Sequence, residues 1–145
     1  MNNNNLFFHA SIYLKGDNLE PAKLTSLLGI TPSFSHSKGQ RWRTSAGSEV
    51  VERTGLWAVT IKSETQVELT EALETLSRQL SANNHIIAEM PGIEEAYLDV
   101  FIAAHTDANG ECDCEFSLNE KSLSAIGKLG LPIKFTVTVS PADIA

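Results

Sequence analysis

Three stretches of the chain are rich in aliphatic, aromatic and β-branched residues, and they constrain the fold more than any other feature. These are LFFHASIYL at 6–14, GLWAVTI at 55–61 and LPIKFTVTV at 131–139. The first and third stretches alternate, and a period of two puts one side of an extended chain against a core. The residue types of the second stretch are also typical of a strand, so each stretch predicts a β-strand. Segments with helical features separate the three stretches, so the chain is expected to combine a sheet with helices.

The first helix is predicted by its end signals. Pro21 suits the first helical position, and Gly29 suits the position just past the last. Leu19 precedes the cap and can pack onto Leu24 as a hydrophobic staple.

Similar signals recur in SLNEKSLSAIGKLGLP at 117–132, where Asn119 is a good cap, Leu118 and Leu123 would form the staple, and Gly130 would end the helix. The recurrence indicates either a weak internal repeat or a chance similarity of common caps.

The longest helix is predicted in SETQVELTEALETLSRQL at 63–80, with a capping box between Ser63 and Gln66. Five apolar residues fall near one face of this helix: Val67, Leu69, Leu73, Leu76 and Leu80. The HIIAEM segment at 85–90 is too short for its periodicity to separate helix from strand, so residues 83–95 stay unassigned.

Two strand pairings are predicted from turns and neighbouring segments. AYLDVFIAAH at 96–105 and CDCEFSL at 112–118 are expected to form a hairpin, because the Asn109-Gly110 pair between them is a strong turn signal. RWRTS at 41–45 is expected to pair with the strand at Leu56–Lys62.

The resulting order predicts an α+β fold. It is a ferredoxin-like split β-α-β-β-α-β unit extended by β-α-β, with a largely antiparallel sheet and the helices packed on one face.

Length and composition are those of one globular domain. Its 145 residues suit a single domain at 6–140, with a disordered N-terminus at 1–5 and a C-terminal tail at 141–145. The net charge of -7 argues against a general nucleic-acid binder, and no apolar run is long enough to span a membrane.

Cys112 and Cys114 are too close in sequence to form a disulfide framework, which indicates a reduced, cytoplasmic compartment. No cofactor is expected.

The chain resembles a bacterial family of domains of unknown function. Members share the pattern G-D-x-L-x-P, then L-G-[IL]-x-P, then K-G, then G-x-W. The matching positions are Gly16, Asp17, Leu19, Pro21, Leu28, Gly29, Ile30, Pro32, Lys38, Gly39, Gly55 and Trp57. The resemblance implies a single-domain cytoplasmic bacterial protein, and the family offers no established catalytic residues to transfer.

The segment ITPSFSHSKGQRWRTS contains the candidate binding residues: His36, Lys38, Arg41, Trp42 and Arg43. Three cations around a tryptophan suit a carboxylate, a phosphate or an acidic protein surface. The alternative is that the cations serve solubility and protect a sheet edge. If RWRTS is a strand, Trp42 points away from Arg41 and Arg43 and is expected to pack in the core beside Trp57.

A second constellation, of zinc-ligand types, lies in the predicted hairpin: His105, Asp107, Cys112 and Cys114. A two-residue turn would put these four side chains on one side of the sheet, but that side also carries Phe101 and Phe116. The cysteines are therefore interpreted as small core thiols, with a metal or redox site as the alternative.

These patterns favour a binding or interaction module without enzymatic activity, with an immunity-type or regulatory role. A protein partner is favoured over a small molecule, and a homo-oligomer is compatible with the sequence. The alternative is a small hydrolase or transferase in which His36, Lys38 and Arg41 orient an anionic substrate. A pocket that holds a histidine beside a carboxylate would support this alternative.

Overall fold

A computed structural model describes residues 6–81 and 87–141 of the chain. The predicted disordered N-terminus and residues 142–145 of the predicted tail lie outside the described residues. The elements follow one another as β1 (Leu6–Gly16), α1 (Pro21–Leu28), β2 (Phe34–His36), β3 (Arg41–Arg43), β4 (Glu49–Val51), β5 (Gly55–Ser63), α2 (Gln66–Ser81), the 3-10 turn η1 (Ile87–Glu89), β6 (Glu95–His105), α3 (Glu120–Gly127) and β7 (Ile133–Ser140).

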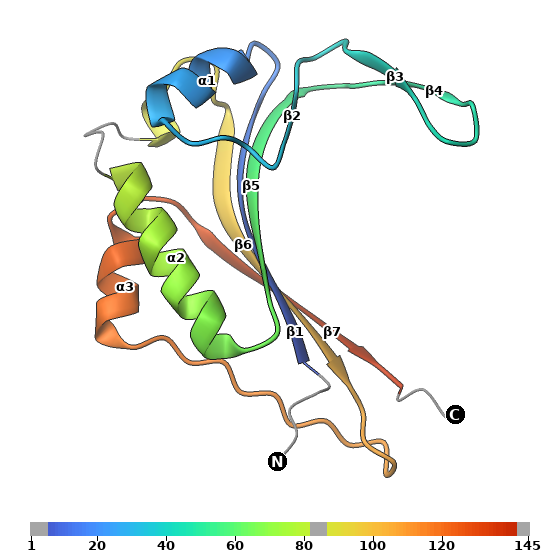
Figure 1. Ribbon diagram of the computed structural model, residues 1–145, viewed down its shortest axis with the longest axis vertical. Helices are drawn as coiled ribbons and strands as arrows, with labels where there is room; N and C mark the ends of the chain where they lie inside the picture. Colours follow the sequence, from blue (N-terminus) through green and yellow to red (C-terminus); the bar gives the residue numbers. More distant parts are fainter. Residues whose placement is uncertain (1–5, 82–86, 142–145) are drawn as a thin grey trace.

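The main sheet has five strands in the order β2-β5-β1-β6-β7, and only the β6–β7 pair is parallel. Each of the connections through α1 and α2 skips one strand, because β5 lies between β1 and β2, and β1 lies between β5 and β6. The three helices cover one face of this sheet (Figure 1). The predicted α+β fold with a mostly antiparallel sheet is confirmed.

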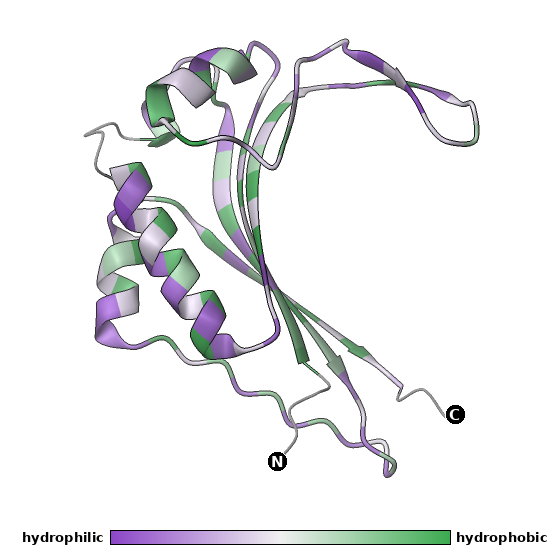
Figure 2. Cartoon of the chain, viewed as in Figure 1, coloured by the Kyte–Doolittle hydropathy of each residue, from purple (hydrophilic) through white to green (hydrophobic). Residues whose placement is uncertain are grey.

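The core lies between this face and the helices. Alternate residues of the central strands are buried there, among them Phe8 and Leu14 of β1, Trp57 of β5 and Leu98 of β6. Hydrophobic and hydrophilic residues alternate along the strands and along α2 (Figure 2). From α2, four of the five predicted apolar residues are buried: Leu69, Leu73, Leu76 and Leu80.

Two details of the helix ends differ from the prediction. The cap of α2 is Thr65, whose hydroxyl accepts a hydrogen bond of 3.2 Å from the amide of Glu68. Ser63 is the last residue of β5 and cannot serve as that cap, and Val67 is exposed. In α3, Asn119 caps the helix as predicted, and Leu123 of the predicted second staple is exposed.

The predicted partner of β5 is also wrong. β2 pairs with β5 at that edge of the sheet, and β3 pairs instead with β4 in a separate two-stranded ribbon. A tight turn explains the difference, because the amide of Thr44 bonds to the carbonyl of Ser48 at 2.9 Å and Gly47 has a φ of 85°. This turn folds Arg41–Arg43 directly onto Glu49–Val51.

The predicted hairpin between 96–105 and 112–118 does not form. β6 pairs with β1 on one side and β7 on the other, so it has no edge left for residues 112–118. The turn itself is present, because the carboxylate of Asp107 accepts bonds from the amides of Asn109 and Glu111. Beyond the turn the chain returns without strand pairing to α3 (Figure 1). The α3 crossover makes β7 parallel to β6.

Candidate functional site

The β3–β4 ribbon projects from the main sheet as an arm (Figure 1). We define the arm as residues 39–52. Its base is closed by two backbone hydrogen bonds, from Gly39 N to Glu52 O at 2.8 Å and from Glu52 N to Gln40 O at 3.0 Å. Gly39 adopts a φ of 83°, a conformation that favours glycine, where the chain turns into the arm.

Trp42 lies on the arm and is not in the core. Its side chain is 44% exposed, and Arg41 and Arg43 are exposed as well. The prediction of core packing is wrong, because β3 belongs to the arm and does not join the sheet that buries Trp57. The predicted parity stays valid: Trp42 shares one side of the ribbon with Val50, and Arg41 and Arg43 share the other.

A chain of side-chain contacts joins Trp42 to the main sheet. The indole Nε1 donates a hydrogen bond of 2.6 Å to Oε1 of Glu52, and Oε2 of Glu52 lies 3.4 Å from Nε2 of His36. His36 is buried, and its ring meets the ring of Phe34 edge-on at a centroid distance of 5.3 Å. Phe34 is itself 54% exposed.

Phe34 and His36 point to the face of the sheet opposite the helices. They pair in register with Ala58 and Leu56, which alternate with the core residue Trp57. Two large exposed aromatic side chains, Trp42 and Phe34, therefore lie at the two ends of one connected set of contacts.

The cations of the segment are largely balanced by nearby carboxylates. Lys38 Nζ lies 2.8 Å from Asp17 Oδ2, and Arg41 Nη1 lies 3.1 Å from Glu49 Oε1. The hydrogen bond from Lys38, with a second from Thr54, lowers the pKa of Asp17, and the bond to Asp17 raises the pKa of Lys38. Within residues 6–81 and 87–141, Arg43 has no ion-pair partner.

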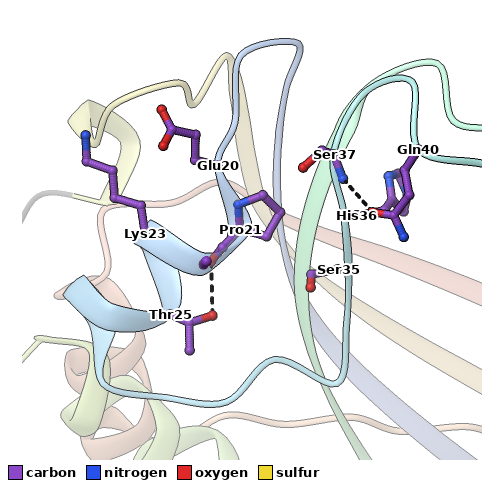
Figure 3. Close-up of a pocket in the computed structure, with 9 residues that line it drawn as sticks. Glu20, Pro21, Lys23, Thr25, Ser35, His36, Ser37 and Gln40 are labelled. Carbon is purple, nitrogen blue, oxygen red and sulfur yellow. Dashed lines mark hydrogen bonds between the residues drawn. The ribbon is translucent and has the colours of Figure 1, made fainter.

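An open pocket of about 440 Å³ lies between α1 and β2 (Figure 3). Its lining residues are Glu20, Pro21, Ala22, Lys23, Thr25, Ser35, His36, Ser37 and Gln40. His36 is one of the lining residues, but its side chain lies on the face of the sheet opposite the helices, and Glu52, the carboxylate beside it, does not line the pocket. Lys38 and Arg41, the other two residues of the enzymatic alternative, do not line it. The Thr25 hydroxyl is engaged by the Pro21 carbonyl and the Trp57 indole.

The zinc-type constellation loses its geometric basis with the predicted hairpin. His105 is exposed at the end of β6, and the carboxylate of Asp107 is occupied by its own turn. Cys112 is half-buried and Cys114 exposed, so they are not core thiols. In the described part of the chain, no three His, Cys, Asp or Glu side chains are grouped so as to hold a metal ion.

Several residues of the sequence pattern lie close together at one end of the sheet. Gly16 at the end of β1 pairs with Gly55 at the start of β5. A Cβ on Gly16 would lie 1.8 Å from the carbonyl oxygen of Gly92, and one on Gly55 would lie 2.6 Å from that of Gly16. Only glycine permits these backbones to approach so closely. Asp17, which follows, holds Lys38.

Sequence reasoning missed two residues of this site, Phe34 and Glu52. Phe34 precedes the basic segment in a polar stretch, and its exposure depends on the edge position of β2. Glu52 reaches Trp42 and His36 only because the arm folds back on itself. The available signal was the pair of β-branched residues Val50 and Val51, which could have indicated a short strand.

No helix in the described residues is both long enough and apolar enough to cross a membrane. A comparison with family models matches residues 6–140 to DUF4279, a domain of unknown function. No curated protein and no solved structure matches the sequence. Since the match spans nearly all of the sequence, the chain belongs to the DUF4279 family of domains of unknown function.

Proposed function

We propose that this protein is a non-enzymatic protein-binding module that uses the arm and Phe34 as its contact surface, with an immunity-type or regulatory role in the bacterial cytoplasm. The observation that carries the proposal is the exposure of Trp42 and Phe34, two large aromatic side chains 44% and 54% exposed. Aromatic residues of this kind dominate the binding energy of protein interfaces.

The contacts beneath the two aromatics favour binding. Glu52 fixes the indole of Trp42, and the buried ring of His36 supports both Glu52 and Phe34. A partner therefore meets side chains whose conformations are already restricted, which reduces the entropy lost on binding.

The shape of the site favours a protein over a small molecule. Trp42 stands on a projecting ribbon, and a projecting element presents its side chains to a partner surface rather than enclosing a ligand. Arg43 lies on the opposite side of the ribbon, without an ion-pair partner in the described residues. A suitable partner has an apolar depression for the aromatics, and a partner that also wraps around the ribbon places a carboxylate against Arg43.

The test compares Trp42→Ala and Phe34→Ala with the wild-type protein. Affinity capture from native lysate with mass spectrometry identifies the partner, and calorimetry with the purified partner then measures the dissociation constant. Each variant is expected to weaken binding by about tenfold or more. Because both residues are exposed, the free energy of unfolding should change by about 0.5 kcal/mol or less.

Val67→Ala is the matched control, because Val67 is an exposed apolar residue on the helical layer. It should leave capture and affinity unchanged. Capture of the same partner by both aromatic variants with wild-type affinity would show that the arm is not the contact surface.

A further inference from the structure

The edge strand β7 presents an apolar stripe that its own chain leaves uncovered. Phe135, Val137 and Val139 are 52%, 55% and 52% exposed. They pair in register with Val100, Ile102 and Ala104 of β6, which are buried in the core, so the stripe lies on the helix-bearing side of the sheet. Figure 1 shows β7 running past the ends of the helices, which leaves this stripe beyond their cover.

A groove continues the stripe into the molecule. It has a volume of about 340 Å³ and is lined by Ile102, Cys114, Phe116, Leu118, Phe135 and Val137. The ring centroid of Phe116 lies 6.0 Å from that of Phe135 and 6.0 Å from that of the core residue Phe8. The apolar surface at the edge is therefore continuous with the core.

The backbone of β7 is also open on one side. β7 pairs with β6, and no other strand of the described residues pairs with its outer edge. Natural sheets protect such edges with charges, prolines or bulges. β7 contains no proline and a single charged residue, Lys134. That ammonium lies over the ring of Tyr97 at 3.8 Å and 3.5 Å from Glu95, so it is engaged with β6.

We infer that β7 pairs antiparallel with β7 of a second copy of this chain, about a two-fold axis at Val137. In this register Val137 faces its own copy, and Phe135 faces Val139, so each large side chain meets a smaller one. On the other face Thr136 meets Thr138, a favourable cross-strand pair. The two sheets become one continuous sheet, and the two stripes lie side by side on the same face, where their side chains contact each other across the new strand pair.

The charges of β7 allow a second copy to pair at this edge. Each chain carries a net charge of -7, so two copies repel each other over most of their surfaces. β7 carries no acidic residue, and in the two-fold register Lys134 faces the neutral Ser140 of the other copy. No like charges then oppose each other across the new strand pair.

The test measures the mass of the protein in solution by light scattering and sedimentation across a range of concentrations. The wild-type chain is expected to reach the mass of a dimer. Val137→Lys would place two ammonium groups opposite each other on the axis, and should raise the dimer dissociation constant by at least about tenfold. Val67→Lys, on an exposed valine of α2, is the matched control and should leave the dimer intact.

A pair of oppositely charged variants tests the register. It also shows whether a loss of the dimer comes from charge repulsion or from misfolding of the variant. Val137→Lys and Val137→Glu should each be folded monomers by circular dichroism and mass, and an equimolar mixture should form a heterodimer because opposite charges then meet on the axis. Any of three results would overturn the inference. The wild-type chain could stay monomeric at all concentrations, the Val137→Lys variant could dimerise like the wild type, or the mixture could stay monomeric. Trp42→Ala should not change the mass, so failure of this inference is separate from failure of the proposed function.

Discussion

Glu52 accepts a hydrogen bond of 2.6 Å from the indole of Trp42, and it does so from the last position of the arm, next to β4. Its second oxygen lies 3.4 Å from the buried His36, so one carboxylate connects the exposed aromatic of the arm to an edge strand of the main sheet. The Glu52 carboxylate thus supplies side-chain contacts between the arm and the main sheet, in addition to the backbone bonds at the base of the arm.

We expect Glu52→Ala to loosen the arm without unfolding the domain. The substitution removes both contacts, and among the described residues no other hydrogen bond or ion pair joins the Trp42 side chain to β2. Amide hydrogen exchange of residues 40–51 should accelerate, while exchange in β1 and β6 stays slow. Glu49→Ala is the control, since it removes only the exposed pair with Arg41. Equal acceleration in both variants would show that Glu52 has no special role.

Lys38→Gln should raise the pKa of Asp17. The hydrogen bond from Lys38 is the largest cause of the lowered pKa of this carboxyl group, and the contribution of Thr54 remains in the variant. The titration of the Asp17 side chain by NMR checks this prediction. Arg41→Gln, which affects a different ion pair, should leave the Asp17 titration as it is. An unchanged Asp17 pKa after Lys38→Gln would mean that the pair does not persist in solution.

The stability of the protein should decrease as the pH falls below the ordinary histidine pKa of about 6.5, in part because of His9. Burial and the nearby charge of Lys62 lower the pKa of His9, and its Nε2 has no hydrogen-bond partner among the described residues. The unfolded chain then binds the proton more tightly than the folded protein, so protonation lowers the free energy of unfolding.

Denaturant titrations from pH 8 to 5 measure this effect, a range that brackets the ordinary histidine pKa. His9→Gln should reduce the loss of stability on acidification. A steeper loss in the His9 variant would contradict the prediction.

Gly16→Ala should destabilise the protein strongly. The added methyl group would lie 1.8 Å from the carbonyl oxygen of Gly92, where no flexible side chain can move aside. We expect a loss of about 1–3 kcal/mol or more in the free energy of unfolding. Gly127→Ala provides the contrast, since its methyl group would meet nothing within 4 Å at the end of α3. That change should be neutral or stabilise by about 0.5–1 kcal/mol. Thermal and denaturant melts of the two variants compare the effects.

Local signals in the sequence were sufficient for the first strand and the first helix. The alternation at 6–14 predicted β1, and α1 begins at Pro21 and ends before Gly29, which has a φ of 70°. These features depend on backbone preferences of single residues and on a periodicity that any sheet or helix must satisfy. The same holds for the α+β class and for most of the buried face of α2.

The strand pairings were decided by contacts between distant parts of the chain. Residues 112–118 carry a strand pattern next to a good turn, yet β1 and β7 already occupy both edges of β6. The sequence of residues 112–118 does not indicate that both edges of β6 are occupied. The hairpin was therefore predicted wrongly, and with it the placement of Cys112 and Cys114 as core thiols. The pairing of β3 with β4 likewise excluded β3 from the main sheet.

The two tryptophans show most clearly which features the sequence determines and which the tertiary structure determines. By itself the sequence determined that Trp42 and Trp57 each lie in a strand, with their side chains opposite those of their neighbours. Tertiary structure alone decided that Trp57 is fully buried and Trp42 is 44% exposed. The physical reason is that a strand's alternation divides its residues between two faces, whereas burial requires a second layer against one of them. The helices provide that layer for β5, and nothing in the described residues provides it for the arm.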